Sequence, residues 1–178
     1  MSIIFKGDQN MQLTFKNEPV QLSGNFVEIG QTIPGFTLVD TKLQDKTMDN
    51  FTEKLLLLNI FPSIDTAVCS DSVRLFNLKA SSFNGCRVLC VSKDLPFAQA
   101  RFCGAENIKN VEMLSAFRNA DFGKSYGLEI TNTAVKGLLA RAVIVVDRNR
   151  KVIYKELVAE ITNKPNYEAC LDAIAKHT

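Results

Sequence analysis

The feature that most constrains the fold is the segment KLLLLNIF at residues 54–61, in which apolar side chains occupy consecutive positions. Successive side chains of a strand point to opposite faces of a sheet, so such a run predicts a strand that is covered on both faces. The segment CRVLCVS at 86–92 has the same character. Between them, residues 68–83 carry apolar side chains at spacings of three and four, which indicates an amphipathic helix. This order of strand, helix and strand is typical of an α/β fold.

The rest of the chain continues this alternation of strand and helix signals. Further strands are predicted at 36–40, near 111–114, at 140–147 and at 151–158. Further helices are predicted at 94–107, where Gly104 is expected to end or weaken the helix, within 120–128, and from near Pro165 onward. Two short runs, 3–5 and 11–15, predict an N-terminal β-hairpin around the turn KGDQN. We therefore expect one domain, residues 1–178, with a central mixed sheet flanked by helices.

Length, charge and apolar runs exclude several classes of protein. The 178 residues suffice for one sizeable core, and the net charge of +2 is too small to indicate a nucleic-acid or acidic-membrane partner. The longest apolar run falls far short of the ~20 residues that a membrane helix needs. The N-terminal segment lacks the apolar core and cleavage site of a signal peptide. We expect a cytoplasmic protein, in which the cysteines are mostly reduced and any disulfide is transient.

The cysteines differ in their predicted surroundings. Cys90 lies in the middle of a predicted strand and Cys170 on the apolar face of the last helix, so both are expected to pack as small hydrophobic residues. Nothing near Cys86, at the start of a strand, marks it as reactive. Cys69 is different, because it follows the turn that ends the buried strand 54–61 and falls in the first turn of the next helix. The free N–H groups of a helix N-terminus favour the thiolate, which is the nucleophilic form.

Two residues before Cys69 also suit a reactive thiol. Thr66 stands three positions earlier, so that its hydroxyl can turn back toward the sulfur. Pro62 fixes the entry of the turn and would help to shield the sulfur from water. Position alone makes Cys69 a candidate nucleophile, since a helix can also begin near an unreactive cysteine.

Three common cysteine chemistries do not fit the sequence. A cysteine hydrolase normally pairs its nucleophile with histidine, but the only histidine is the penultimate residue, His177. The chain has no C-x-x-C pair, which argues against both a structural zinc site and a dithiol of the thioredoxin type. These exclusions leave Cys69 working with an arginine and a distant cysteine. Arg74, in the same helix, and Arg141, before an apolar strand, are the candidates; either could instead be a surface charge.

The sequence resembles the peroxiredoxin family at this point. The segment PSIDTAVC at 62–69 contains the family's pattern of proline, three residues, threonine, two residues and cysteine. The longer segment 59–77 is similar to the bacterial thiol peroxidase branch, the atypical two-cysteine peroxiredoxins. So are DLPFAQARFCGAENI at 94–108, GLLARAVIVVD at 137–147 and EITNKPNYEA at 160–169. These segments occur in order, so the resemblance covers most of the chain.

The resemblance implies a thioredoxin-like fold with an N-terminal β-hairpin, and a homodimer. It implies that Cys69 is the peroxidatic cysteine and Cys103 the resolving cysteine, with Thr66, Pro62 and Arg141 completing the active site. Cys90 matches a further family cysteine that is not needed for turnover. The implied substrates are hydrogen peroxide and alkyl or lipid hydroperoxides, with thioredoxin as the reductant. No metal, haem, flavin or other cofactor is implied.

Two alternative functions use the same residues. A redox sensor or thiol-transfer protein could use a Cys69–Cys103 disulfide as a switch, and the sequence does not separate this from a peroxidase. A non-catalytic binding module of the same fold would require an unreactive Cys69. Proportionate consumption of thioredoxin during fast peroxide turnover would distinguish the enzyme from both.

Overall fold

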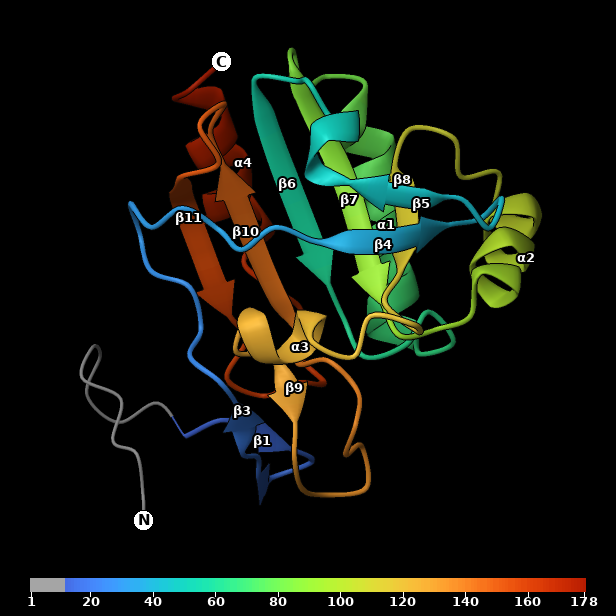
Figure 1. Cartoon of the computed structure of the whole chain (residues 1–178), viewed down its shortest axis with the longest axis vertical. Coiled ribbons are helices and arrows are strands. Elements are labelled where there is room, and N and C mark those ends of the chain that lie inside the picture. Colours follow the sequence, from blue (N-terminus) through green and yellow to red (C-terminus); the bar gives the residue numbers. More distant parts are fainter. Residues whose placement is uncertain (1–11) are drawn as a thin grey trace.

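A seven-stranded mixed sheet forms the centre of the computed structural model, which describes residues 12–178 (Figure 1). Its strands lie in the order β11 (Val152–Leu157), β10 (Ala142–Val146), β6 (Leu55–Ile60), β7 (Cys86–Ser92), β8 (Glu112–Ser115), β4 (Thr37–Asp40) and β5 (Asp45–Thr47). The three central strands β6, β7 and β8 run parallel, and the flanking pairs are antiparallel. The predicted α/β class with a central mixed sheet is confirmed.

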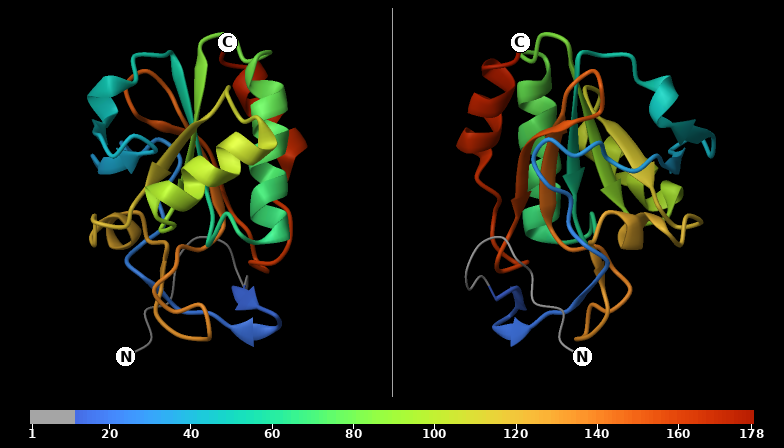
Figure 2. Two further views of the ribbon diagram at one scale, coloured as in Figure 1. Left: turned by 90° about the vertical axis from the view of Figure 1, so that its right-hand side faces the viewer. Right: turned by 60° about the vertical axis from the view of Figure 1, so that its left-hand side comes forward.

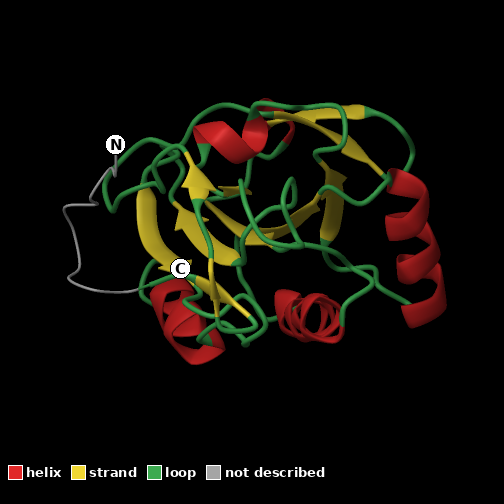
Figure 3. Cartoon of the chain, turned by 90° about the horizontal axis from the view of Figure 1, so that it is seen from below, coloured by secondary structure: helices red, strands yellow, loops and turns green. Residues whose placement is uncertain are grey.

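Helices cover both faces of this sheet. They are α1 (Ala67–Ala80), α2 (Pro96–Glu106), the short α3 (Phe122–Ser125) and α4 (Tyr167–Ala175), together with the 3₁₀-helix η1 (Met48–Asn50). The green α1 and the red α4 lie side by side on one face in both views of Figure 2. Seen from below, the sheet is a curved layer with helices on its two sides (Figure 3). Among residues 12–178, none of the helices has the length and apolar character to cross a bilayer.

The strand β6 shows why consecutive apolar residues were needed. Leu55 and Leu57 pack in the apolar cluster beneath α1 and α4, whereas Leu56 and Leu58 pack in the cluster on the opposite face, with α3. All four side chains are fully buried. Because side chains alternate along a strand, a sheet covered on both faces requires apolar residues at every position. The consecutive apolar residues that predicted β6 are therefore a consequence of its burial on both faces.

The structure describes an N-terminal hairpin that the sequence did not predict, and the predicted turn KGDQN at residues 6–10 lies outside the described residues. The described hairpin joins β1 (Thr14–Phe15) to β2 (Glu18–Pro19), and its two turn residues, Lys16 and Asn17, have positive φ values of 50° and 66°. The run 3–5 and Met11 lie outside the described residues, and of residues 12–15 only Thr14 and Phe15 form a strand. Two-residue strands carry too little alternation to be recognised in a sequence, which explains why the hairpin β1–β2 was not predicted.

Two further details differ from the prediction. The helix α2 does not end at Gly104 but continues to Glu106, and Asn107 ends it in the left-handed conformation, with φ of 56°. Asparagine tolerates this conformation better than most residues, so it replaces glycine as the helix terminator. The short strands β3 (Leu22–Ser23) and β9 (Glu129–Ile130), which pair with each other, and β5 and η1 were not predicted, because each spans three residues or fewer.

Candidate active site

The loop between β6 and α1 builds the site. The buried strand β6 ends at Ile60, Pro62 is buried two residues later, and α1 begins at Ala67. The first bond of the helix runs from the Ser70 N–H to the Thr66 carbonyl oxygen, at 3.0 Å. Cys69 is thus the third residue of α1, in the turn whose N–H groups precede that bond and form the positive end of the helix. The predicted position of Cys69 in the first turn is confirmed.

Two polar side chains contact the sulfur of Cys69. The Thr66 Oγ1 lies 2.7 Å and the Arg141 Nη2 lies 3.2 Å from Cys69 Sγ, and the Cys69 side chain is fully buried. Thr66 Oγ1 also lies 3.0 Å from the Ser63 carbonyl oxygen. A hydroxyl carries one hydrogen, so Thr66 can donate to the carbonyl while it accepts from a thiol, or donate to a thiolate. The arrangement accommodates both protonation states of the sulfur.

Arg141 is a buried cation, 2% exposed, at the residue before β10. Its Nε donates to the Ile161 carbonyl oxygen at 2.8 Å, and its Nη2 faces Cys69 Sγ. Its Nη1 is buried and has no hydrogen-bond partner among the described residues. A desolvated guanidinium favours a negative charge on its neighbour, because nearby water screens the attraction little. The Nη2 of Arg141 therefore faces the Cys69 sulfur in surroundings that exclude water, and its Nη1 has no partner within residues 12–178.

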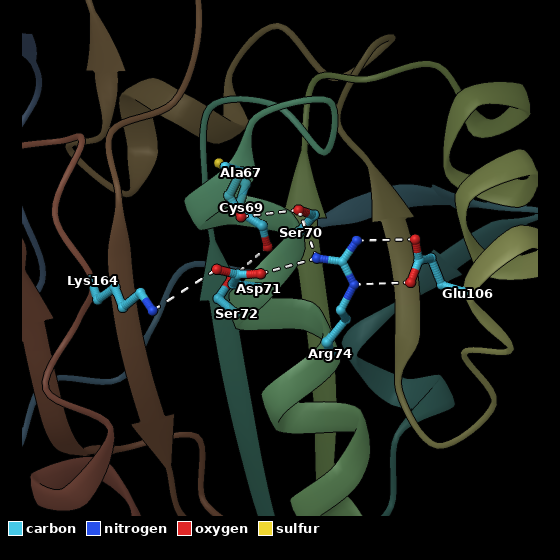
Figure 4. A network of polar contacts seen from close by, with 8 residues as sticks. All are labelled: Ala67, Cys69, Ser70, Asp71, Ser72, Arg74, Glu106 and Lys164. Carbon is cyan, nitrogen blue, oxygen red and sulfur yellow. Dashed lines mark hydrogen bonds and ion pairs between the residues drawn. The ribbon is translucent and has the colours of Figure 1, made fainter.

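Arg74, the other candidate, does not face the sulfur. Its guanidinium forms two bonds to the Glu106 carboxylate, at 2.9 and 3.0 Å, and one to Asp71, at 3.0 Å (Figure 4). It also bonds to the hydroxyl of Ser70 at 3.1 Å. The bond to Arg74 lowers the pKa of Glu106, so the pair is lost only when the pH falls below the ordinary range of a glutamate. Arg74 thus ties α1 to the C-terminal end of α2.

Cys103 lies in α2, half-buried, and packs against the apolar cluster that contains Cys69. All five cysteines are free in this structure. Burial raises the pKa of the Cys103 thiol. Burial also raises the pKa values of Cys86, Cys90 and Cys170, each to about 12, which suits the packing roles expected for them.

Asp94 also belongs to the site, although it did not stand out in the sequence. Its carboxylate accepts hydrogen bonds from the Ser63 hydroxyl and the Ile64 N–H, both at 2.7 Å, and from the Ser92 hydroxyl at 2.6 Å. Asp94 therefore holds the loop before Thr66. Its position two residues after the strand 86–92 could have identified Asp94 from the sequence. The carboxyl ends of neighbouring parallel strands meet at one edge of a sheet, so this position lies near the loop that carries Cys69.

Comparison with known proteins identifies the family of this chain. The family model described as Redoxin matches residues 28–171. The thiol peroxidase of Corynebacterium glutamicum is 48% identical over 160 residues, which cover 90% of this chain and 96% of that protein. The crystal structure of a peroxiredoxin-like protein from Aquifex aeolicus is 38% identical, with a TM-score of 0.89, and covers 97% of this chain and 100% of that chain.

A third relative supports the fold alone. The thiol peroxidase from Chromobacterium violaceum is 24% identical, with a TM-score of 0.84 over 94% of this chain and 97% of that chain. Together these matches agree with the thioredoxin-like arrangement of sheet and helices described above. The chain belongs to the Redoxin family and, within it, to the thiol peroxidases, which are thiol-dependent peroxidase enzymes.

Proposed function

We propose that this enzyme reduces hydrogen peroxide and alkyl or lipid hydroperoxides to water or alcohols, with Cys69 as the peroxidatic cysteine. The observation that carries the proposal is the convergence of Thr66 Oγ1 and Arg141 Nη2 on the buried Cys69 Sγ, at 2.7 and 3.2 Å. A hydroxyl, a guanidinium and a helix N-terminus around one sulfur favour a reactive thiolate.

The first step follows from these contacts. The Cys69 thiolate attacks the nearer peroxide oxygen, an S–O bond forms, and the O–O bond breaks. The sulfur becomes a sulfenic acid, and the other oxygen leaves as hydroxide or alkoxide and takes up a proton. Thr66 and the Nη1 of Arg141, which has no hydrogen-bond partner among residues 12–178, are suited to stabilise the charge that moves from sulfur to the leaving oxygen. Buried Pro62 helps to keep water from the sulfur.

In the second step, Cys103 attacks the sulfenic sulfur, an S–S bond forms, and water leaves. Thioredoxin then reduces this disulfide by thiol–disulfide exchange. A disulfide requires Cα atoms within about 4.4–6.8 Å of each other, with the sulfur atoms facing. Cys69 cannot face Cys103 while its sulfur stays between Thr66 and Arg141, so we propose that the first turn of α1 and the segment around Cys103 unwind locally. Gly104 lowers the cost of this opening, since glycine is a weak helix former.

We further propose that residues 1–178 form one domain, that the enzyme is a homodimer, and that it acts in the cytoplasm without a cofactor. The seven-stranded sheet carries an apolar cluster on each face, and both clusters share this one sheet, which supports a single domain. A reducing compartment suits a chain whose five cysteines are free in the structure.

The test is a coupled assay in which NADPH oxidation is followed with thioredoxin, thioredoxin reductase and a panel of hydroperoxides. Turnover in proportion to the peroxide supplied is expected, with hydrogen peroxide and organic hydroperoxides both accepted. A Cys69–Cys103 disulfide that forms once but is not turned over would instead identify a redox sensor. No peroxide-dependent oxidation of Cys69 would refute the proposal.

A further inference from the structure

The segment 159–161, between β11 and α4, contacts the site on one side and the N-terminal hairpin on the other. The carbonyl oxygen of Ile161 accepts the bond from Arg141 Nε at 2.8 Å, and this bond is buried. The residue before it, Glu160, extends its carboxylate to the hairpin β1–β2. Figure 1 shows the described part of the hairpin below the sheet, beside the chain that leads to α4.

The carboxylate of Glu160 accepts five hydrogen bonds. Its Oε2 accepts from Thr14 Oγ1 at 2.7 Å and from the Asn17 N–H at 3.2 Å. Its Oε1 accepts from the Lys16 N–H at 3.0 Å and from the N–H and hydroxyl of Thr162 at 3.1 and 2.7 Å. Burial alone would raise the pKa of Glu160, but these bonds outweigh it and lower the pKa to about 2. Glu160 is therefore ionised at neutral pH and can accept all five.

Backbone hydrogen bonds also join the hairpin to the residues on both sides of Glu160. The Thr14 N–H donates to the Ala159 carbonyl oxygen at 2.7 Å, and the Ile161 N–H donates to the Thr14 carbonyl oxygen at 2.9 Å. Thr14 and Glu160 thereby form an isolated parallel β-bridge. The N–H of Ile161 is thus bound by the hairpin, and the carbonyl oxygen of the same residue accepts the bond from Arg141.

The orientation of Arg141 depends on this carbonyl. Its Nη1 has no partner among the described residues, and its Nη2 contact is to the reacting sulfur itself. The bond from Nε to the Ile161 oxygen is therefore the contact that fixes the guanidinium plane independently of Cys69. A shift of that oxygen would tilt both donors that the reaction uses.

We propose that Glu160 is a positioning residue of the peroxidase reaction, which binds the hairpin turn and so fixes the Ile161 carbonyl and, through it, the guanidinium of Arg141. This inference rests on the proposed role of Arg141. It makes the N-terminal hairpin a supporting part of the active site.

The test is the rate at which Cys69 is oxidised by limiting hydrogen peroxide, measured by competition with a reporter peroxidase, in the full chain. Glu160→Gln retains the side-chain shape but replaces one oxygen with a donor, so about half of the bonds are lost. The rate is expected to fall about tenfold, because catalysis depends steeply on donor placement. Glu18→Gln, which removes the same charge from the hairpin itself, is expected to leave the rate unchanged.

A double-mutant cycle distinguishes positioning from a general structural effect. If Glu160 acts through Arg141, Glu160→Gln does not decrease the rate of Cys69 oxidation any further in the Arg141→Met background. An equal loss in both backgrounds, or an unchanged rate for Glu160→Gln, would overturn the inference while the proposed function stands. An unchanged rate for Arg141→Met would overturn the role of Arg141 and the inference together.

A milder variant serves if Glu160→Gln fails to fold. Thr14→Val removes a single donor to Glu160 and leaves the backbone bonds of the bridge in place. A smaller decrease in the oxidation rate is expected, again absent in the Arg141→Met background. A loss that persists in that background would count against positioning.

Discussion

Cys69 and Cys103, the two cysteines of the proposed cycle, lie in surroundings of opposite character. Cys69 is fully buried, and Thr66 and Arg141 fix its sulfur from two sides. Cys103 is half-buried, and no side-chain hydrogen bond to its sulfur occurs in the described part of the chain. The first thiol occupies a preformed polar site, whereas the second lies on a helix surface.

The helix α1, which carries Cys69, and the helix α2, which carries Cys103, pack differently against the rest of the chain. α1 places Val73 and Phe76 in the core with no exposed surface. In α2, Phe97 is 67% exposed, whereas Phe102 packs in the apolar cluster that contains Cys69. Two exposed ion pairs, Arg74–Glu106 and Arg101–Asp65, also tie α2 to the region of Cys69. Exposed ion pairs contribute little stability, and α2 buries three residues where α1 buries five, so we expect α2 to be the easier helix to open. From this comparison, we expect Cys69 to stay fixed until it is oxidised and α2 to open more readily than α1.

The strongest test of this comparison is Cys69→Ser. We expect complete loss of peroxide turnover with the fold retained, because serine is nearly the same size but a far weaker nucleophile at neutral pH. The coupled thioredoxin assay and the thermal unfolding midpoint measure the two effects. Wild-type turnover in this variant would remove the distinction between the two cysteines altogether.

Arg141→Met should have the next largest effect. Methionine fills space but supplies neither charge nor donors, and the loss of one preorganised donor typically slows a reaction about 10²–10³-fold. The peroxide-dependent rate of Cys69 oxidation is the measurement, with Arg141→Lys as the control that retains the charge and loses the fork of donors. A rate that remains at the wild-type value would reduce Arg141 to a structural cation.

Glu106→Gln should affect the second cysteine and spare the first. Loss of the bidentate pair with Arg74 loosens the end of α2, so disulfide formation after oxidation should accelerate by about two- to fivefold, consistent with a modest exposed pair. The rate of the first oxidation should not change. Rapid quench and mass spectrometry resolve the two steps.

Glu53→Gln is the matched control for that experiment. It breaks another arginine–glutamate pair of 3.0 Å, with Arg87, which lies away from α2. Disulfide formation in this variant should proceed at the wild-type rate. Equal acceleration in both variants would mean that general loosening, and not release of α2, sets the rate.

Cys90→Ser should have the smallest effect on catalysis. Cys90 is fully buried, and its sulfur receives a long hydrogen bond of 3.6 Å from Asn59 Nδ2. Turnover and the peroxide-induced disulfide should be retained, while a buried hydroxyl lowers the free energy of unfolding by about 1–3 kcal/mol if it stays unpaired. Absence of the disulfide in this variant would show that Cys90, and not only Cys103, takes part in resolution.

The sequence alone determined the elements whose signals are local. Consecutive apolar residues located β6 and β7, and the turn and helix periodicity put Cys69 in the first turn of α1. These predictions succeed because burial on both faces of a strand, or along one face of a helix, requires apolar residues at regular positions close together in the sequence. The resemblance to peroxiredoxins added the expected roles of Thr66 and Arg141, which the structure brings to the sulfur.

Only the tertiary structure decided which distant groups meet. The residue pattern left Arg74 and Arg141 both open, the resemblance favoured Arg141, and the contact that brings Arg141 to the sulfur spans 72 positions. The link from Glu160 to the hairpin spans 144 positions at Lys16. Asp94 likewise accepts a hydrogen bond from the N–H of Ile64, 30 positions away in the sequence. No periodicity records such contacts, because a carboxylate that binds a distant backbone leaves no pattern in its own neighbours. These long-range hydrogen bonds arise from the packing of the chain, and they place the groups that surround Cys69.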